Sequence, residues 1–237
     1  MRIGITLPSF SADVGAVIDT ARAAEKAGIH GVFAFDHLWP TGSPQRPALA
    51  AYPIVAAVLA ATREIRVGTL VARIGLLPDE VVLASLSSLA TIGGGRLVAG
   101  LGTGDSTSAD ENERLGIPYP AARTRRTRLD DVGAALKGAG IETWIGAGTR
   151  ATNELAHSIG VTLNLWGAQP DRVREIAATG AAVSWAGPFP KDDSGPELLE
   201  SLSRAGATWA VWGWPPSVES VVSAAQRARI ELASAAR

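Results

Sequence analysis

The stretch Gly93-Gly-Gly-Arg-Leu-Val-Ala-Gly-Leu-Gly-Thr-Gly-Asp105 decides the fold of this chain. It predicts a tight turn, then a buried strand from about Arg96 to Leu101, and then a glycine-rich exit that ends in a carboxylate. The glycines at the exit remove side chains, so that a flat or anionic ligand can approach the backbone closely. Asp105 follows the carboxyl end of the strand, where α/β proteins place their chemistry. A loop that needs glycine only to turn is the alternative interpretation.

Several familiar site motifs do not fit the chain. A dinucleotide-binding Gly-x-Gly-x-x-Gly/Ala begun at Gly100 would have Asp105 in its last position, and the Gly-Lys-Ser/Thr of a P-loop is absent. The sequence has no His-Glu-x-x-His motif and no cysteine, so we expect no metal site. The absence of Gly-x-Ser-x-Gly argues against a hydrolase of that kind.

The composition indicates a globular protein without a strongly charged partner. Hydrophobic residues make up 46% of the 237 residues, enough for a sizeable core, and the net charge of −1 favours neither nucleic acid nor an anionic membrane. The apolar run at the N-terminus is too short for a signal peptide, and no segment approaches the ~20 apolar residues of a membrane span. We therefore expect a soluble, cytoplasmic protein that acts on a small molecule, with residues 1–237 in a single domain.

Short apolar runs on both sides of the organising strand alternate with segments of helical periodicity. The further strands that this pattern predicts are Arg2–Leu7, Gly31–Asp36, Ile65–Val71, Ile141–Gly146, Val161–Trp166, Ala181–Trp185 and Thr208–Trp212. Helices are expected from 14 to 28 with Ser11 as N-cap, at 48–62, 78–93 and 121–137, after residues 147–149 to about 159, at 196–205, and from 170 and 217 onward, with a loop or short helix at 106–112. This alternation predicts an α/β fold, specifically a (β/α)8 TIM barrel, and a doubly wound open sheet is the alternative.

In a barrel, the loops that follow the strands all lie on one face, which brings distant residues together. The residues so placed are Asp36, His37, Trp39, Val71, Arg73, Thr103, Asp105, Gly146, Ala147, Gly148, Thr149, Trp166, Trp185, Trp212 and Trp214. Of the three histidines only His37 falls on this face, so it is a candidate catalyst, with a hydrogen-bonded loop residue as the alternative. His30 and His157 are interpreted as structural.

Three further features also have a structural alternative. The turn at residues 146–149 precedes a helix and can hold a phosphate, or it is an ordinary strand-to-helix turn. The tryptophans can form the floor of a pocket for a planar ring, or they can plug the barrel. The arginines at 123, 125, 126 and 128 can hold a polyanionic tail, although pairing with Asp130, Asp131 or other acids on a solvated face is the favoured interpretation.

The chain resembles the bacterial luciferase-like superfamily, and in particular its branch that uses the deazaflavin coenzyme F420. The matching segments, in the right order over most of the chain, are Arg2-Ile-Gly-Ile-Thr-Leu-Pro8, Asp36-His37, Val67-Gly-Thr-Leu-Val71, Gly94-Gly-Arg-Leu-Val-Ala-Gly-Leu-Gly-Thr-Gly104 and Trp144-Ile-Gly-Ala-Gly148. The resemblance implies a (β/α)8 barrel with coenzyme F420 at the carboxyl ends of its strands.

The resemblance also implies roles for individual residues. His37 would match the base that takes the proton of a substrate hydroxyl, and Asp105 would match a carboxylate that donates a proton. Leu70 and Val71 would match a strand-end bulge, often with a cis peptide bond, that backs the cofactor ring. The other residues expected to bind the cofactor are Asp36, Trp39, Arg73, Thr103, Gly104, Ser108, Gly146, Ala147, Gly148 and Thr149.

The chain departs from the family pattern at three points. Asp105 is shorter than the usual Glu, Trp39 is displaced from the usual aromatic position, and Lys137-Gly-Ala-Gly-Ile-Glu-Thr-Trp144 lacks the usual insertion before strand five. The first hypothesis is hydride transfer between F420 and a small organic substrate. The alternatives are an FMN-dependent luciferase-like monooxygenase and a non-catalytic flavin-binding or dimerisation barrel. Small apolar residues on more than one face of helices 48–62 and 81–92 favour a homodimer, with helices buried against the barrel as the alternative.

Overall fold

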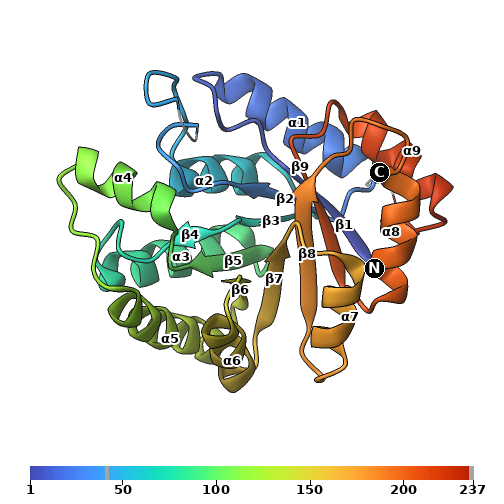
Figure 1. Ribbon diagram of the computed structural model, residues 1–237. Coiled ribbons are helices and arrows are strands. Elements are labelled where there is room, and N and C mark those ends of the chain that lie inside the picture. The colour runs from blue at the N-terminus through green and yellow to red at the C-terminus, as the bar shows by residue number, and fades with distance from the viewer. Residues whose placement is uncertain (41–42, 235–237) are drawn as a thin grey trace.

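The computed structural model describes residues 1–40 and 43–234, and over this part of the chain it shows a closed barrel of parallel strands surrounded by helices (Figure 1). The strands are β1 (Arg2–Thr6), β2 (Gly31–Ala34), β3 (Arg66–Thr69), β4 (Ala72–Arg73), β5 (Leu97–Gly102), β6 (Glu142–Ala147), β7 (Thr162–Trp166), β8 (Val183–Pro188) and β9 (Trp209–Gly213). They neighbour one another in the order β3-β2-β1-β9-β8-β7-β6-β5-β4. Short, mostly apolar runs form them because parallel strands inside a ring of helices bury both faces.

The barrel closes where β5 pairs with both β3 and β4. Val67 and Gly68 of β3 pair with the first half of β5, and Ala72 and Arg73 of β4 pair with its second half. β3 and β4 are therefore two halves of one barrel strand, separated by Leu70–Val71, whose peptide bond is cis as the resemblance predicts. This closure confirms the eight-stranded barrel and excludes the open doubly wound sheet.

The helices follow the expected alternation, with two differences in detail. They are α1 (Val14–Lys26), α2 (Ala51–Ala61), α3 (Asp79–Gly93), α4 (Ser106–Arg114), α5 (Ala122–Gly138), α6 (Arg150–Ile159), α7 (Pro170–Ala177), α8 (Gly195–Arg204) and α9 (Val218–Arg227). The prediction that Ser11 caps the first helix is wrong, because the carboxylate of Asp13 accepts the Ala16 N–H at 3.0 Å, and Ser11 bonds the carbonyl of Pro8 instead. The polar segment after β5 forms a full helix, α4, which stands apart from the other helices (lime green in Figure 1).

Aromatic rings fill the interior of the barrel. Phe33, Trp144 and Trp209 contact one another with ring centroids 5.1 to 5.9 Å apart. Glycines on neighbouring strands make room for them: a Cβ at Gly31 would lie 2.9 Å from the Trp209 ring, and one at Gly4 would lie 2.9 Å from the Phe33 ring. Trp144 and Trp209 therefore plug the barrel.

The connection from α5 to β6 confirms that the usual insertion is missing. Only residues 139–141 separate the two elements, so the chain turns directly from the helix into the strand. Within the described residues, none of the helices combines the length and apolar character that crossing a membrane requires.

Candidate active site

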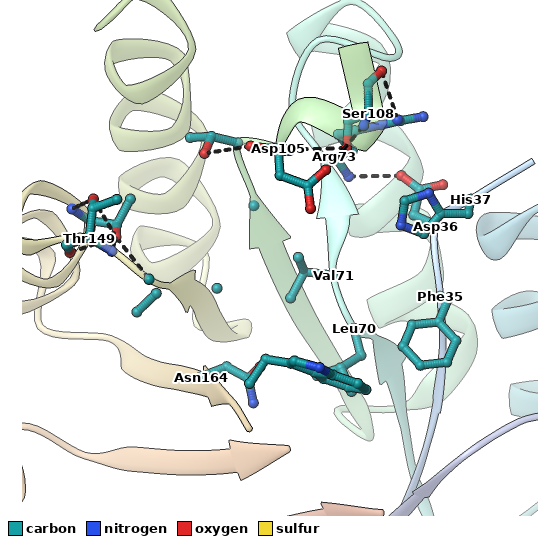
Figure 2. A pocket seen from close by; sticks show the side chains of 18 of the residues that line it. Phe35, Asp36, His37, Leu70, Val71, Arg73, Asp105, Ser108, Thr149 and Asn164 are labelled. Carbon is teal, nitrogen blue, oxygen red and sulfur yellow. Dashed lines mark hydrogen bonds between the residues drawn. The ribbon is translucent and has the colours of Figure 1, made fainter. Parts of the chain in front are cut away.

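A cavity of about 540 Å³ lies at the carboxyl ends of the strands (Figure 2). The predicted site residues that line it are Asp36, His37, Leu70, Val71, Arg73, Thr103, Gly104, Asp105, Ser108, Gly146, Ala147, Gly148 and Thr149. They lie together because parallel barrel strands all end on one face. Trp39 is the exception, because it is not one of the described residues that line the cavity.

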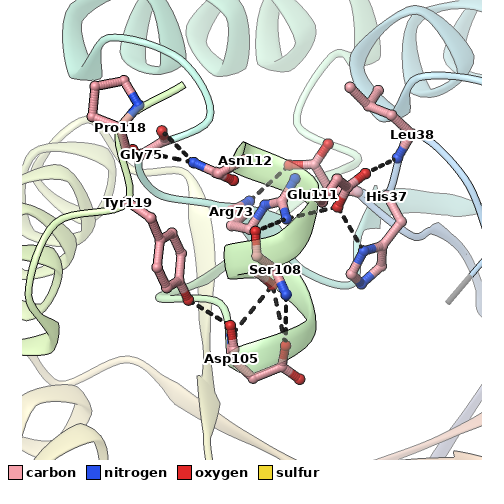
Figure 3. Close-up of polar contacts among 11 residues, drawn as sticks. His37, Leu38, Arg73, Gly75, Asp105, Ser108, Glu111, Asn112, Pro118 and Tyr119 are labelled. Carbon is pink, nitrogen blue, oxygen red and sulfur yellow. Dashed lines mark hydrogen bonds and ion pairs between the residues drawn. The ribbon is translucent and has the colours of Figure 1, made fainter. Parts of the chain in front are cut away.

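Glu111, which is not among the site residues predicted from the sequence, lies at the centre of the polar side of this site (Figure 3). It is 3% exposed, and its carboxylate contacts Nδ1 of His37 at 3.1 Å and Nη1 of Arg73 at 2.7 Å and accepts the Leu38 N–H. Burial alone would raise the pKa of Glu111, but the hydrogen bonds from His37 and Leu38 and the charge of Arg73 outweigh it and lower the pKa. Glu111 is therefore an ionised, fully engaged carboxylate at neutral pH.

The sequence contained one signal for Glu111. Asp105, Ser108 and Glu111 are spaced three residues apart, which puts them on one face if the segment is helical. Because the sequence of this segment fits a loop as well as a short helix, the spacing alone does not place Glu111 at the site.

The contact with Glu111 orients the imidazole of His37. Because an ionised carboxylate only accepts hydrogen bonds, we assign the ring proton of neutral His37 to Nδ1, which leaves a lone pair on Nε2. Nε2 lies on the far side of the ring from Glu111, and the ring lines the cavity (Figure 3). The arrangement can accept a proton from a hydroxyl group bound in the cavity.

Asp36 and Arg73 form a buried pair beside this dyad. The carboxylate of Asp36 accepts the backbone N–H of Arg73 at 2.8 Å, and the two residues are 5% and 4% exposed. Burial raises the pKa of Asp36, because it outweighs the hydrogen bond and the positive charge from Arg73. The Arg73 guanidinium reaches from Glu111 towards the carbonyl of Ser108, and its Nε and Nη2 are buried without a partner among the described residues.

Asp105 caps the helix that carries Glu111. Its Oδ1 accepts the N–H of Ser108 at 3.1 Å, and the Ser108 hydroxyl lies 3.2 Å from the Asp105 N–H, which completes a capping box. Burial would raise the pKa of Asp105, but the hydrogen bonds from Ser108 outweigh it and lower the pKa. Asp105 is thus ionised at neutral pH and anchors α4 against the cavity.

The turn after β6 is closed by a second capping box. The Thr149 hydroxyl accepts the N–H of Thr152 at 3.2 Å, while the Thr152 hydroxyl accepts the N–H groups of Gly148 and Thr149. The turn therefore presents the N-terminal end of α6 to the cavity, with its positive partial charge.

The floor beside this turn is built from backbone and small side chains. A Cβ at Gly102 would lie 2.5 Å from Cγ2 of Val71, and one at Gly146 would lie 3.2 Å from the same atom. Glycine at both positions lets Val71 lie flat against the strands, as a surface that backs a planar ring requires. The residues present therefore fit a flat cofactor with a phosphate-bearing tail.

The structure changes the predictions for two groups of residues, the tryptophans near the strand ends and the arginines of α5. Trp185 and Trp212 do not face the cavity: they pack against each other at 5.2 Å in the core outside the barrel, while Trp166 and Trp214 do line it. Among the described residues the arginines of α5 pair with neither Asp130 nor Asp131, although Arg128 does pair with another acid, as the favoured interpretation allows. Arg128 pairs with Asp79 at 2.7 Å, and the buried Arg125 bonds the carbonyl of Thr103 at 2.8 Å and lies over the Tyr119 ring.

Fold and site together define a class of protein, a (β/α)8 barrel with a histidine–carboxylate pair and a glycine-walled cavity at the carboxyl ends of its strands. The family model described as luciferase-like monooxygenase matches residues 1–139. The chain belongs to the luciferase-like monooxygenase family.

Two curated relatives share part of the sequence. Both are named F420-dependent glucose-6-phosphate dehydrogenase: that of Beutenbergia cavernae is 32% identical over 115 residues, and that of Nakamurella multipartita is 34% identical over 114 residues. Each match covers 48% of this chain and 33% of the relative, so the similarity spans about a third of the length of either enzyme.

Solved structures share the barrel over nearly the whole chain. An F420-dependent secondary alcohol dehydrogenase in complex with an F420–acetone adduct superposes with a TM-score of 0.77 at 14% identity, covering 96% of this chain and 97% of that one. The coenzyme F420-dependent tetrahydromethanopterin reductase of Methanopyrus kandleri gives 0.73 at 14% identity, covering 94% and 96%. A monooxygenase from Streptomyces bottropensis gives 0.66 at 14% identity, covering 95% and 97%. At these identities the likeness establishes the fold.

Proposed function

We propose that this protein is an oxidoreductase that transfers a hydride between coenzyme F420 and a small organic substrate with a carbinol or carbonyl group. The observation that carries the proposal is the His37–Glu111 pair, in which a buried carboxylate fixes Nδ1–H and turns Nε2 toward the cavity. Oxidation of a carbinol needs such a base for the hydroxyl proton. The names of the two curated relatives support F420 as the cofactor.

The proposed cofactor contacts follow the shape of the cavity. Leu70 and Val71 would back the ring, and the turn at 146–149, with the N-terminal end of α6, would hold the phosphate. The remaining proposed contacts are Asp36, Arg73, Thr103, Gly104 and Ser108. When bound, the deazaflavin would supply the hydride acceptor or donor.

In this proposal the protein supplies positioning and one proton transfer. Nε2 of His37 takes the hydroxyl proton during oxidation and returns it during reduction, while Glu111 stabilises the imidazolium that forms. Asp105, expected from the resemblance to donate a proton, has a lowered pKa and caps α4, so its part in the proposal is to hold Ser108 and the helix of Glu111 in place. Asp105→Asn keeps an oxygen acceptor for the cap, so this variant should retain turnover. If Asp105→Asn instead abolished turnover, as expected for His37→Ala, Asp105 would be the proton donor after all.

Fluorescence titrations with oxidised F420 and with FMN test the cofactor assignment. We expect F420 to bind more tightly than FMN, and His37→Ala to abolish turnover in a screen of carbinols while leaving F420 affinity nearly unchanged. A preference for FMN would instead support a luciferase-like monooxygenase. Binding of neither cofactor would support a non-catalytic barrel.

We also propose that the protein forms a homodimer through the outward face of α3. Val81 and Ile92 are 44% and 52% exposed, and their separation of three helical turns puts them on one face. Light scattering should give the mass of a dimer, and Ile92→Glu should give that of a monomer with an unchanged circular dichroism spectrum. A monomeric wild-type protein would contradict the proposal.

A further inference from the structure

One wall of the cavity consists of four aromatic side chains, Phe10, Phe35, Trp166 and Trp214, which we call the aromatic wall. Phe35 is its centre, with ring centroids 5.5 Å from Phe10 and 5.2 Å from Trp214 in stacked geometry, and 5.8 Å from Trp166 edge-on. Trp166 and Trp214 also meet edge to face at 5.6 Å. Neither the His37–Glu111 pair nor the glycine-lined floor uses this wall.

The backbone is adapted to hold the two indoles. Trp214 has φ 50°, in the left-handed region that a bulky residue rarely adopts, and its N–H donates to the hydroxyl of Thr6 at 3.0 Å. At the preceding position, a Cβ on Gly213 would lie 2.9 Å from the ring of Trp166, so glycine leaves the space in which that ring lies. Backbone strain that is kept in place by tertiary contacts is characteristic of functional sites.

Both indoles remain partly open to solvent. Trp166 is 44% exposed and Trp214 is 53% exposed, although each takes part in the ring contacts of the wall. An aromatic face that is fixed in position and left uncovered at a cavity provides stacking area for a planar ligand.

The charges of the cavity argue against an anionic substrate. Among the described residues that line it, Arg73 is the one arginine or lysine, and its Nη1 is engaged by Glu111. Its other guanidinium nitrogens, Nε and Nη2, are inaccessible to solvent and so out of reach of a ligand in the open cavity. A phosphate group on the substrate would therefore find no free arginine or lysine among the described residues that line the cavity.

We propose that the substrate is an uncharged molecule with a planar apolar ring system, which stacks on one of the two indoles, Trp166 or Trp214, and contacts the other edge-on, because their planes are 77° apart. Phe35 directly precedes Asp36 and His37 at the end of β2, and Figure 2 shows the three at one side of the cavity. A ring on the aromatic wall therefore places a carbinol or carbonyl substituent next to the His37–Glu111 pair. This inference rests on the proposed function for the reaction, and it assigns the substrate class.

The test compares three probes by titration calorimetry, in the absence and presence of saturating F420. They are 2-naphthalenemethanol, its saturated non-planar counterpart decahydro-2-naphthalenemethanol, and glucose 6-phosphate. The variants are Trp214→Gly, which suits the left-handed backbone and removes the ring, Trp166→Ala, which removes the other indole, and Trp214→Phe, which keeps a stacking face. Val14→Ala, an exposed apolar change on α1, is the control.

We expect the planar carbinol to bind most tightly. Trp214→Gly and Trp166→Ala should each weaken it about tenfold, Trp214→Phe should restore most of the affinity, and F420 affinity should stay the same in all variants. Tighter binding of glucose 6-phosphate, or an unchanged affinity for the planar carbinol in Trp214→Gly, would overturn the inference. A tenfold loss of F420 affinity in Trp214→Gly would overturn it as well, because the wall would then belong to the cofactor. If wild-type protein fails to bind F420 but selects the planar carbinol through Trp214, the proposed function fails and the inference on the ligand class stands.

Discussion

Replacing Glu111 with Gln should reverse the tautomer of His37. One oxygen of Glu111 accepts the Leu38 N–H, and the other faces Nδ1 of His37 and Nη1 of Arg73. A carboxamide has one oxygen and one NH2 group. If the oxygen faces His37 and Arg73, the NH2 group meets the Leu38 N–H, and if the NH2 group faces His37 and Arg73, it meets the Arg73 guanidinium, so in either orientation two donors face each other. When the NH2 group faces His37 it donates to Nδ1, the ring proton moves to Nε2, and Nε2 can no longer accept a proton.

The structure also sets the size of the effect. Glu111 is 3% exposed, so the unpaired donor is not compensated by water, and loss of the charge leaves the buried Arg73 guanidinium without its counter-ion. Breaking a buried ion pair on one side costs about 3 kcal/mol, or about 6 to 12 °C in melting temperature for a chain of this size. Turnover should fall about 10²- to 10⁴-fold, the usual contribution of a positioned general base.

Nitrogen NMR of protein labelled at its three histidines measures the tautomer without a substrate. At mildly alkaline pH the wild type should show an Nδ1–H signal for His37, assigned with His37→Gln. His30 provides an internal reference of the opposite kind, because its Nδ1 accepts the Ile3 N–H at 3.1 Å. Glu113→Gln, an exposed change on the same helix, is the matched control. An unchanged His37 tautomer and melting temperature in Glu111→Gln would refute the reasoning.

Three further predictions concern stability, each measured by urea unfolding. Asp36→Asn should become more stable relative to the wild type as the pH rises above the ordinary aspartate pKa. Burial raises the pKa of Asp36 in the folded state, so the wild type loses stability once the unfolded carboxyl ionises and the folded one does not; a difference that is constant with pH would contradict this. Glu25→Ala should cost about 2 kcal/mol at neutral pH, because one Glu25 oxygen accepts the N–H groups of residues 63–65 at 2.7 to 3.0 Å. Burial raises the pKa of Glu25, but these hydrogen bonds outweigh it and lower the pKa. The loss of stability in Glu25→Ala should therefore be present above the ordinary glutamate pKa and vanish as the pH falls through the lowered pKa. A loss that does not depend on pH would show that the charge of Glu25 does not contribute. Gly68→Ala should cost about 1 to 3 kcal/mol of stability, because its Cβ would lie 2.3 Å from the Val98 carbonyl oxygen. Gly138→Ala is the control: a Cβ there would have no neighbour within 4 Å, so the change should be neutral or stabilising. Equal effects of the two changes would refute the packing argument.

Local sequence patterns predict the strands and helices and most of the cavity wall. Apolar runs of strand length alternate with helical periodicity, and this local pattern predicts a barrel whose loops share one face. His37, Asp105 and the turn at 146–149 could be placed there because each directly follows a strand. The order of strands along the chain was therefore sufficient to bring them together.

The tertiary structure alone decided which side chains meet. Glu111 lies 74 residues from His37, and no periodicity in either segment predicts that α4 would turn its face toward the end of β2. The tryptophans show the same limit. Trp209 and Trp212 point to opposite faces of β9 because they are an odd number of residues apart, but closure of the barrel decides which face becomes the interior. Local pattern determines strands, helices and their order, whereas long-range packing determines the partners of each side chain.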